Sequence, residues 1–176
     1  MSSRKITIAW LVSVGLMAVF AGMSWINLEL SPEAGAQKFE ISGYQVFPII
    51  SALMLLQVAS LLATLLTPEL VARVISGLLA PIMLAHALFV FFGLQSNTQN
   101  AIEVQITEMT GVSGFASQAE FVEFAGETFL WVGYLLAITL NFAVLLAKAV
   151  LKSVSSNAKA SKEELVSEPD LWETQK

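Results

Sequence analysis

The 176-residue sequence contains no cysteine and a single histidine, and only 13% of its residues are charged. The lack of cysteine excludes a disulfide scaffold. A soluble domain carries about 25% charged residues, so this chain has far too few for a soluble enzyme of its size. The formal net charge is −5, whereas a nucleic-acid-binding surface is basic. What remains to be explained is a hydrophobic content of 56%.

Long uncharged apolar runs account for that content. Four windows contain no Asp, Glu, Lys or Arg: residues 6–28, 45–67, 74–94 and 128–147. A helix that crosses a bilayer needs about 20 apolar residues, whereas the strands of a membrane barrel alternate over about ten. The first window also exceeds the hydrophobic region of a cleavable signal peptide, about 7–15 residues. The sequence therefore predicts an all-α integral membrane protein with four transmembrane helices.

The basic residues predict the orientation of these helices. Only Lys38 lies in the segment between the first two windows. The others all fall on the opposite side: Arg4, Lys5, Arg73, Lys148, Lys152, Lys159, Lys162 and Lys176. The positive-inside rule then places both termini in the cytoplasm of a multi-pass protein of the cell membrane. We expect residues 1–152 to form the transmembrane domain and residues 153–176, which include Trp172, to be a disordered cytoplasmic tail.

The connections predict two local structures. Thr67 and Pro68 form a tight turn in which Thr67 caps the next helix, so the second and third spans are an antiparallel hairpin. In the long outer segment, residues 97–114 alternate weakly, as in a strand. Ser117 and Glu120 then form a capping box, which predicts a short amphipathic outer helix that runs into the fourth span.

Three glutamates of this outer segment follow helical spacing. If the segment is a helix, Glu120, Glu123 and Glu127 lie on one side of it. We interpret them as a solvated helix face. The alternative is a site for a divalent cation, because such ions prefer carboxylate oxygens.

Polar side chains at membrane depth are the candidates for chemistry. His86 and Gln57 fall at nearly the same depth on the two helices of the hairpin, so we expect a hydrogen bond between them. Asn141 and Ser60 share a shallower depth. Ionisable residues inside a membrane mark functional sites by default, but polar groups also bind one another and hold helices together.

Small and aromatic residues predict packing and anchoring. The small residues recur at four-residue spacing, which permits close helix approach within the chain or between copies. They are Gly77, Pro81 and Ala85 on the third span, Ala18 and Gly22 on the first, and Ala59 and Ala63 on the second. Trp25 and Trp131 are expected at the outer membrane interface, where amphipathic aromatic rings anchor helices.

The order of these features resembles a known family. Trp25 closes the first span, the stretch Ser42-Gly43-Tyr44-Gln45-Val46-Phe47-Pro48 leads into the second, and Asp170-Leu171-Trp172 lies in the tail. This pattern is similar to the tryptophan-biosynthesis-associated transmembrane proteins of actinobacteria, which are small four-helix proteins. The resemblance implies uptake or membrane handling of tryptophan, with an amino-acid or partner site around Trp25, Gly43 and Pro48.

Two functional hypotheses follow. The first is a transporter, or a transport helper, for an aromatic amino acid that acts as an oligomer. The second is a non-catalytic accessory or assembly subunit of a larger membrane complex. Under both hypotheses the partners are the lipid bilayer and other membrane chains. We expect no enzyme activity, cofactor, metal site or nucleic-acid partner.

Overall fold

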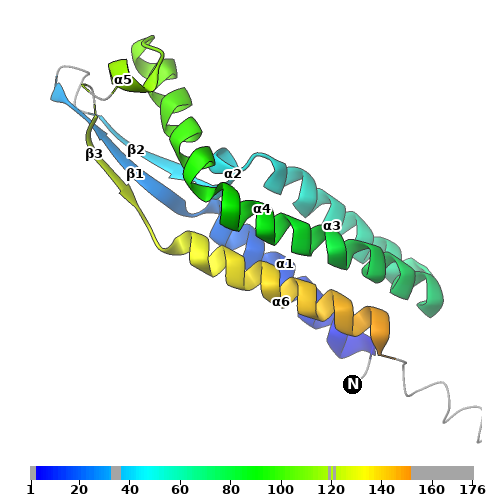
Figure 1. The fold of residues 1–176 in the computed structure, drawn as a ribbon. Coiled ribbons are helices and arrows are strands. Elements are labelled where there is room, and N and C mark those ends of the chain that lie inside the picture. Colours follow the sequence, from blue (N-terminus) through cyan, green and yellow to red (C-terminus); the bar gives the residue numbers. More distant parts are fainter. Residues whose placement is uncertain (1–2, 33–36, 119, 121, 152–176) are drawn as a thin grey trace, which may run out of the picture.

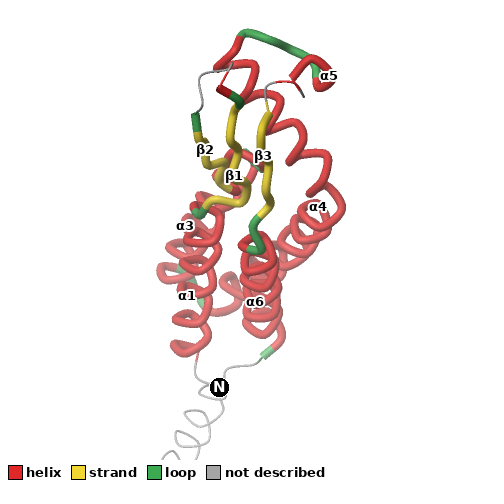
Figure 2. Tube along the Cα trace, turned by 90° about the vertical axis from the view of Figure 1, so that its left-hand side faces the viewer, coloured by secondary structure: helices red, strands yellow, loops and turns green. Residues whose placement is uncertain are grey.

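A computed structural model describes residues 3–32, 37–118, 120 and 122–151 of the chain (Figure 1). The helices are α1 (Ser3–Gly22), α2 (Gly43–Val46), α3 (Ile49–Leu66), α4 (Glu69–Thr110), α5 (Phe115–Gln118) and α6 (Leu130–Val150). The strands are β1 (Ser24–Leu30), β2 (Lys38–Ser42) and β3 (Val122–Glu127). The four long helices form a bundle, and the three strands form a small sheet at one end of it (Figure 2).

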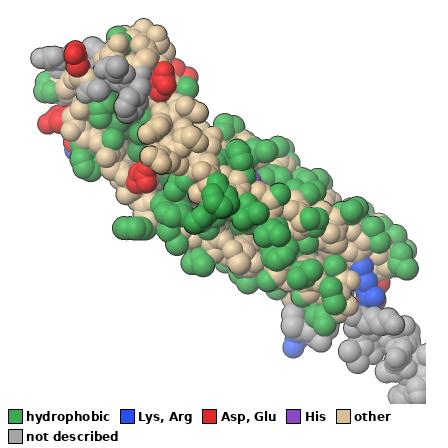
Figure 3. All heavy atoms as spheres, viewed as in Figure 1, with side chains coloured by type: hydrophobic (Ala, Val, Ile, Leu, Met, Phe, Trp, Pro, Cys, Tyr) green, Lys and Arg blue, Asp and Glu red, His purple; other side chains and the backbone are tan. Residues whose placement is uncertain are grey.

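The bundle has the surface of a membrane-spanning unit. α1, α3, α4 and α6 are each long and apolar enough to cross a bilayer, and only 28% to 33% of each apolar window is buried within the protein. Large apolar side chains cover the outer surface, among them Leu55 at 72% and Phe92 at 78% exposure. Figure 3 shows these side chains over the bundle, with most of the visible acidic groups gathered at the sheet end. Apolar surface on this scale requires lipid as its solvent.

The sheet is antiparallel, with strand order β2-β1-β3. Leu28 of β1 lies opposite Phe39 of β2 and Ala125 of β3. One face of the sheet packs on α4, where Leu28, Leu30 and Ile106 form a small buried cluster. The sheet and the end of α4 therefore make a head that projects from the bundle (Figure 1).

The prediction that the first span reaches Leu28 was wrong. α1 ends at Gly22, and the rest of the apolar run is strand β1. Within β1, Ile26, Leu28 and Leu30 are buried while Asn27 is exposed. That period of two belongs to a strand, but residues 24–28 of the strand carry no charge and so continue the uncharged run that begins at Ile6. The second span also begins later than predicted, at Ile49, after Pro48 separates it from α2.

The third span is much longer than the predicted window of residues 74–94. α4 contains 42 residues, or about 63 Å at 1.5 Å per residue, and its last part continues beyond the bundle to the sheet. The strand-like interpretation of residues 97–114 was therefore wrong. Ile106 is buried and Ile102 is partly buried, four residues apart, whereas Val104 is 57% exposed. The apolar residues of this segment that pack against the sheet, Ile102 and Ile106, therefore follow the helical period.

The predicted amphipathic outer helix was also wrong. Residues 122–127 form strand β3, because they pair with β1 from Ile26 to Leu30. Ser117 belongs to the four-residue α5, and Ala119 and Phe121 lie outside the described residues. In the strand, Glu123 and Glu127 do not share a helix face with Glu120. No cluster of possible metal ligands occurs in the part of the chain that the structure describes.

The turn between α3 and α4 differs from prediction in one detail. Thr67 does not cap α4; its hydroxyl donates to the backbone oxygen of Ala63 at 2.9 Å, within α3. Pro68 occupies the N-cap position of α4, without a side-chain cap. Arg73 forms an ion pair with Glu69 at 2.7 Å in the first turn of α4.

Both ends of the described chain lie at the end of the bundle that is remote from the sheet (Figure 2). Arg4, Lys5, Arg73 and Lys148 fall at that end, and Lys38 lies in the sheet, where it pairs with Glu29. Most basic groups of the described residues thus lie at one end of the bundle and most acidic groups at the other, with Lys38 and Glu69 as the exceptions. The predicted tail, with Trp172 and three of the lysines, lies outside the described residues, as does Lys152.

Candidate functional site

A closed ring of hydrogen bonds lies inside the bundle and joins α1, α3 and α6. The indole N–H of Trp10 donates to Oε1 of Gln57 at 2.7 Å. The amide nitrogen of Gln57 donates to Oδ1 of Asn141 at 3.3 Å, and the amide nitrogen of Asn141 donates to the Ser13 hydroxyl at 2.9 Å. Ser13 completes the ring by donating to the backbone oxygen of Trp10 at 2.8 Å. We call these four residues the polar ring.

The members of the polar ring find hydrogen-bond partners within the ring itself. All four residues are fully buried, and each one both donates and accepts within the ring. Gln57 is therefore not bonded to His86, and the predicted Gln57–His86 pair was wrong. Asn141 binds Gln57 and Ser13. The sequence analysis missed Trp10 and Ser13, although their i, i+3 spacing places them on one face of α1.

A second cluster lies between the bundle and the sheet. Nε2 of His86 on α4 is 3.0 Å from the hydroxyl of Tyr134 on α6. The ring of Tyr134 lies 5.5 Å from that of Trp25, which lies 6.0 Å from Phe47. His86 and Tyr134 are buried. We call this set the junction cluster, because it joins α4 and α6 to the start of the sheet.

Gly43 fits directly against the junction cluster. A side-chain carbon at Gly43 would lie 2.5 Å from Cε2 of Trp25 and 3.0 Å from the backbone oxygen of Ala21. Trp25 is only 2% exposed, and its indole N–H donates to the backbone oxygen of Phe20 at 2.8 Å. The structure thus brings Trp25 and Gly43 together as predicted, but it places the indole inside the protein rather than at a lipid interface.

Lys148 is a buried cation near the basic end of the bundle. Its ammonium group lies 3.2 Å from the hydroxyl of Thr64, 3.4 Å from that of Thr7 and 4.7 Å from the centre of the Trp10 ring. The side chain is only 8% exposed. A cation over an indole face is attracted by the ring quadrupole, so Lys148 connects the basic end to the polar ring through Trp10.

The small-residue stripe of α4 lies mainly on the outer surface. Pro81 and Ala85 are exposed, and a carbon added at Gly77 would lie 3.7 Å from Ala149 of α6. The face of α4 that packs within the chain carries Ser76, Met83 and His86 instead. On α1, Ala18 is partly buried, and a carbon added at Gly22 would lie 3.8 Å from Tyr44. Packing of Pro81 and Ala85 within the chain was thus a wrong expectation.

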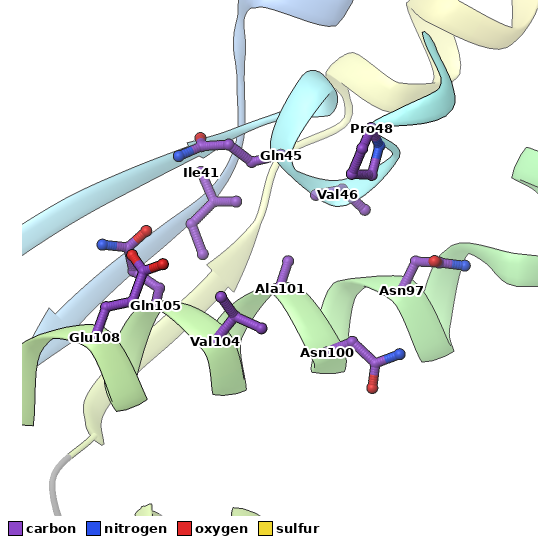
Figure 4. A pocket seen from close by; sticks show the side chains of 10 residues that line it. All are labelled: Ile41, Gln45, Val46, Pro48, Asn97, Asn100, Ala101, Val104, Gln105 and Glu108. Carbon is purple, nitrogen blue, oxygen red and sulfur yellow. The ribbon is translucent and has the colours of Figure 1, made fainter. Parts of the chain in front are cut away.

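An open groove separates β2 and α2 from α4. Its volume is about 360 Å³, and its lining includes Ile41, Gln45, Pro48, Gln105 and Glu108. Figure 4 shows Gln105 and Glu108 reaching from α4 toward the strands, while Asn100 points away from them. Pro48, a residue predicted for the outer site, thus lines a groove, whereas Trp25 and Gly43 belong to the junction cluster.

A larger cavity lies on the other side of α4, beneath the sheet. Its volume is about 410 Å³. The residues that line it are Gln95, Thr98, Gln99, Ile102 and Ile106 of α4, Gln118 of α5, and Val122, Ala125 and Glu127 of β3. We call it the sheet cavity. Its size is in the range of small-molecule sites, about 300–1,000 Å³.

Gln118 is held firmly at the wall of the sheet cavity. Its amide nitrogen lies 2.8 Å from the hydroxyl of Thr107, 2.8 Å from the backbone oxygen of Val112 and 3.1 Å from that of Glu103. The side chain is 1% exposed, and its Oε1 is a buried acceptor with no partner in the described part of the chain. An unsatisfied buried acceptor is costly, so this atom requires a separate explanation.

Comparison with known proteins adds one finding. The family described as tryptophan-associated transmembrane protein matches residues 7–174. Neither the curated proteins nor the solved structures yield a match.

Proposed function

Because the chain belongs to the tryptophan-associated transmembrane protein family, we propose that it acts in the uptake or membrane handling of tryptophan. The observation that carries this proposal is the contrast between the bundle and the head. In the bundle the polar ring is closed by internal hydrogen bonds, whereas two cavities with polar residues in their walls lie beside the sheet. The chain would then bind its solute at the head.

Transfer across the membrane requires more than one chain under this proposal. Trp10, Gln57 and Asn141 are buried inside the bundle and are held there by hydrogen bonds to one another, so they are not free to bind a solute. We therefore propose that the chain works as an oligomer or with another membrane protein, and that its four helices anchor and orient the head. The positive-inside rule supports a head outside the cell and termini in the cytoplasm, since the basic groups lie at the opposite end. No catalytic step is part of the proposal.

The second candidate is a non-catalytic accessory or assembly subunit of a larger membrane complex. The feature that favours it is the outer face of the sheet. Phe124 is 53% exposed there, and β2 and β3 are both edge strands of the described sheet. Edge strands present unpaired backbone groups that pair readily with another chain. Such a subunit would bind protein rather than solute at its head.

The experiment that tests the first candidate is uptake of labelled tryptophan by a strain that lacks the protein. We expect a loss of uptake that is restored by the wild-type chain, with uptake of an unrelated amino acid such as lysine as control. Gln57→Ala and His86→Ala should restore it less well, and uptake must be normalised to the amount of protein in the membrane. Unchanged tryptophan uptake in the deletion strain would refute this function.

Crosslinking and purification from the same membranes test the second candidate. A stoichiometric partner that is lost when Phe124 is replaced by a charged residue would support the accessory role. Recovery of the chain alone or as a homo-oligomer would contradict it.

A further inference from the structure

The sheet cavity combines three features that point to one class of ligand. It is lined by apolar side chains, by the carboxylate of Glu127 and by Gln118, whose Oε1 is a buried acceptor with no partner in the described part of the chain. We propose that it binds a free aromatic amino acid whose ring carries an N–H group, with the ammonium at Glu127 and the ring N–H at Oε1 of Gln118. This inference rests on the proposed function and names the site at which that function would begin.

The polar and apolar parts of the cavity are arranged along its length. In β3, Glu127 lies opposite Ile26 and Val122 lies opposite Leu30, so these two residues are at opposite ends of the strand. On α4, Gln95 precedes Ile106 by 11 residues, about 16 Å along the helix. Glu127 and Gln95 thus belong to the end near the bundle, and Val122 and Ile106 to the far end. An elongated ligand with one charged and one apolar end matches this arrangement.

The end near the bundle suits the main-chain groups of an amino acid. Among the described residues no lysine or arginine lines the cavity, so none of them supplies a cation to the carboxylate of Glu127 there. An ammonium group would supply that cation through charge-assisted hydrogen bonds. The amide groups of Gln95 and Gln99 lie at the same end and offer donors for the carboxylate of the ligand.

The far end suits an aromatic ring that bears a donor. Ile102, Ile106 and Val122 provide apolar contact for the ring. The amide nitrogen of Gln118 is bound to Thr107 of α4 and to Val112 of the following turn, so the end of the amide left without a partner is Oε1, an acceptor. An indole N–H is a donor without acceptor capacity and would satisfy that atom. A phenyl ring would leave it unsatisfied, and such mismatches discriminate strongly between ligands.

The experiment is a binding titration of the full-length protein, purified and reconstituted in neutral lipid nanodiscs, with labelled L-tryptophan as probe. Two further probes separate the contacts: N-acetyl-L-tryptophan lacks the ammonium charge, and L-phenylalanine lacks the ring N–H. We expect saturable binding of tryptophan and affinities at least about tenfold lower for both analogues.

Matched variants locate the site. Glu127→Gln removes the charge in the cavity and should weaken binding about tenfold or more. Glu123→Gln makes the same change in the same strand, at a residue that does not line the cavity, and should bind normally. Ala125→Leu adds bulk to the cavity wall and should abolish binding without removing a polar contact. Circular dichroism and thermal unfolding establish that each variant is folded.

The outcomes separate this inference from the proposed function. Loss of uptake in the deletion strain together with no saturable binding by the folded wild-type protein overturns the inference and leaves the function standing. Equal effects of Glu127→Gln and Glu123→Gln, or full binding by the folded Ala125→Leu variant, also overturn it. Site-specific binding with unchanged uptake would support the cavity and refute the uptake function.

Discussion

Trp10 and Gln57 are joined across α1 and α3 by a hydrogen bond of 2.7 Å from the indole N–H to the amide oxygen. Because Gln57 also donates to Asn141, it connects three helices through a single side chain. In lipid the apolar side chains of separate helices gain little from leaving the solvent. Such polar contacts, together with close packing, therefore give the helix arrangement its specificity.

The first prediction concerns Gln57. Gln57→Leu removes two bonds and leaves the Trp10 indole N–H and Asn141 Oδ1 without partners, so we expect a loss of about 1–2 kcal/mol in the free energy of unfolding. Unfolding by a denaturing detergent, followed by far-UV circular dichroism, measures it. Leu55→Ala on the same helix is the control, because Leu55 is 72% exposed to lipid.

A double-mutant cycle tests whether the ring acts as a unit. In the variant with both Gln57→Leu and Asn141→Leu, a donor and its acceptor disappear together. We therefore expect the combined loss to be smaller than the sum of the two single losses. Strict additivity would show that Gln57 and Asn141 contribute independently.

The second prediction uses two glycines with opposite surroundings. At Gly43 an added methyl group would meet Trp25 at 2.5 Å, whereas at Gly15 nothing lies within 4 Å. Gly43→Ala should therefore lower the free energy of unfolding by about 1–3 kcal/mol through overpacking. Gly15→Ala should raise it slightly, by up to about 1 kcal/mol, because alanine is the better helix former. Changes of the same sign in the two melting temperatures would contradict this account of the junction cluster.

The four spans could be predicted from the sequence because charge and length decide membrane insertion, and neither depends on the packing partner. The limits of the spans could not. Trp25 to Leu28 continue an uncharged run but belong to strand β1, which pairs with β2 and β3. Gln95, Ser96 and Asn97 end the apolar window of α4 but not the helix, because its outer part packs on the sheet instead of in lipid.

For the candidate site, too, the sequence predicts some features and not others. Gln57, Asn141 and His86 stand out in the sequence because polar residues at membrane depth are rare. Their partners could not be predicted, because depth does not give the direction in which a side chain points around its helix. Gln57 faces Trp10 and Asn141, and His86 faces Tyr134. The sheet cavity was missed because β3 had been predicted as a helix.

The third prediction concerns the bond between His86 and Tyr134. Tyr134→Phe keeps the aromatic contact with Trp25 but removes the hydroxyl 3.0 Å from His86. We expect a loss of about 0.6–1.7 kcal/mol, the usual range for a polar contact between membrane helices. Tyr44→Phe is the control, because the hydroxyl of Tyr44 makes only a long bond of 3.4 Å to Ala18. An equal or larger effect of the control would contradict a specific role for the His86–Tyr134 pair.

The last prediction concerns orientation, and the lack of cysteine in the chain makes it simple to test. Glu123 lies in β3 of the head, and Glu69 lies at the turn between α3 and α4, at the other end of the bundle. Both are exposed glutamates, so Glu123→Cys and Glu69→Cys are matched single substitutions. If the basic end faces the cytoplasm, a membrane-impermeant maleimide added to intact cells should label only Glu123→Cys, and permeabilised cells should label both. Labelling of Glu69→Cys alone in intact cells would place the head inside the cell, and the sheet cavity would then receive its ligand from the cytoplasm.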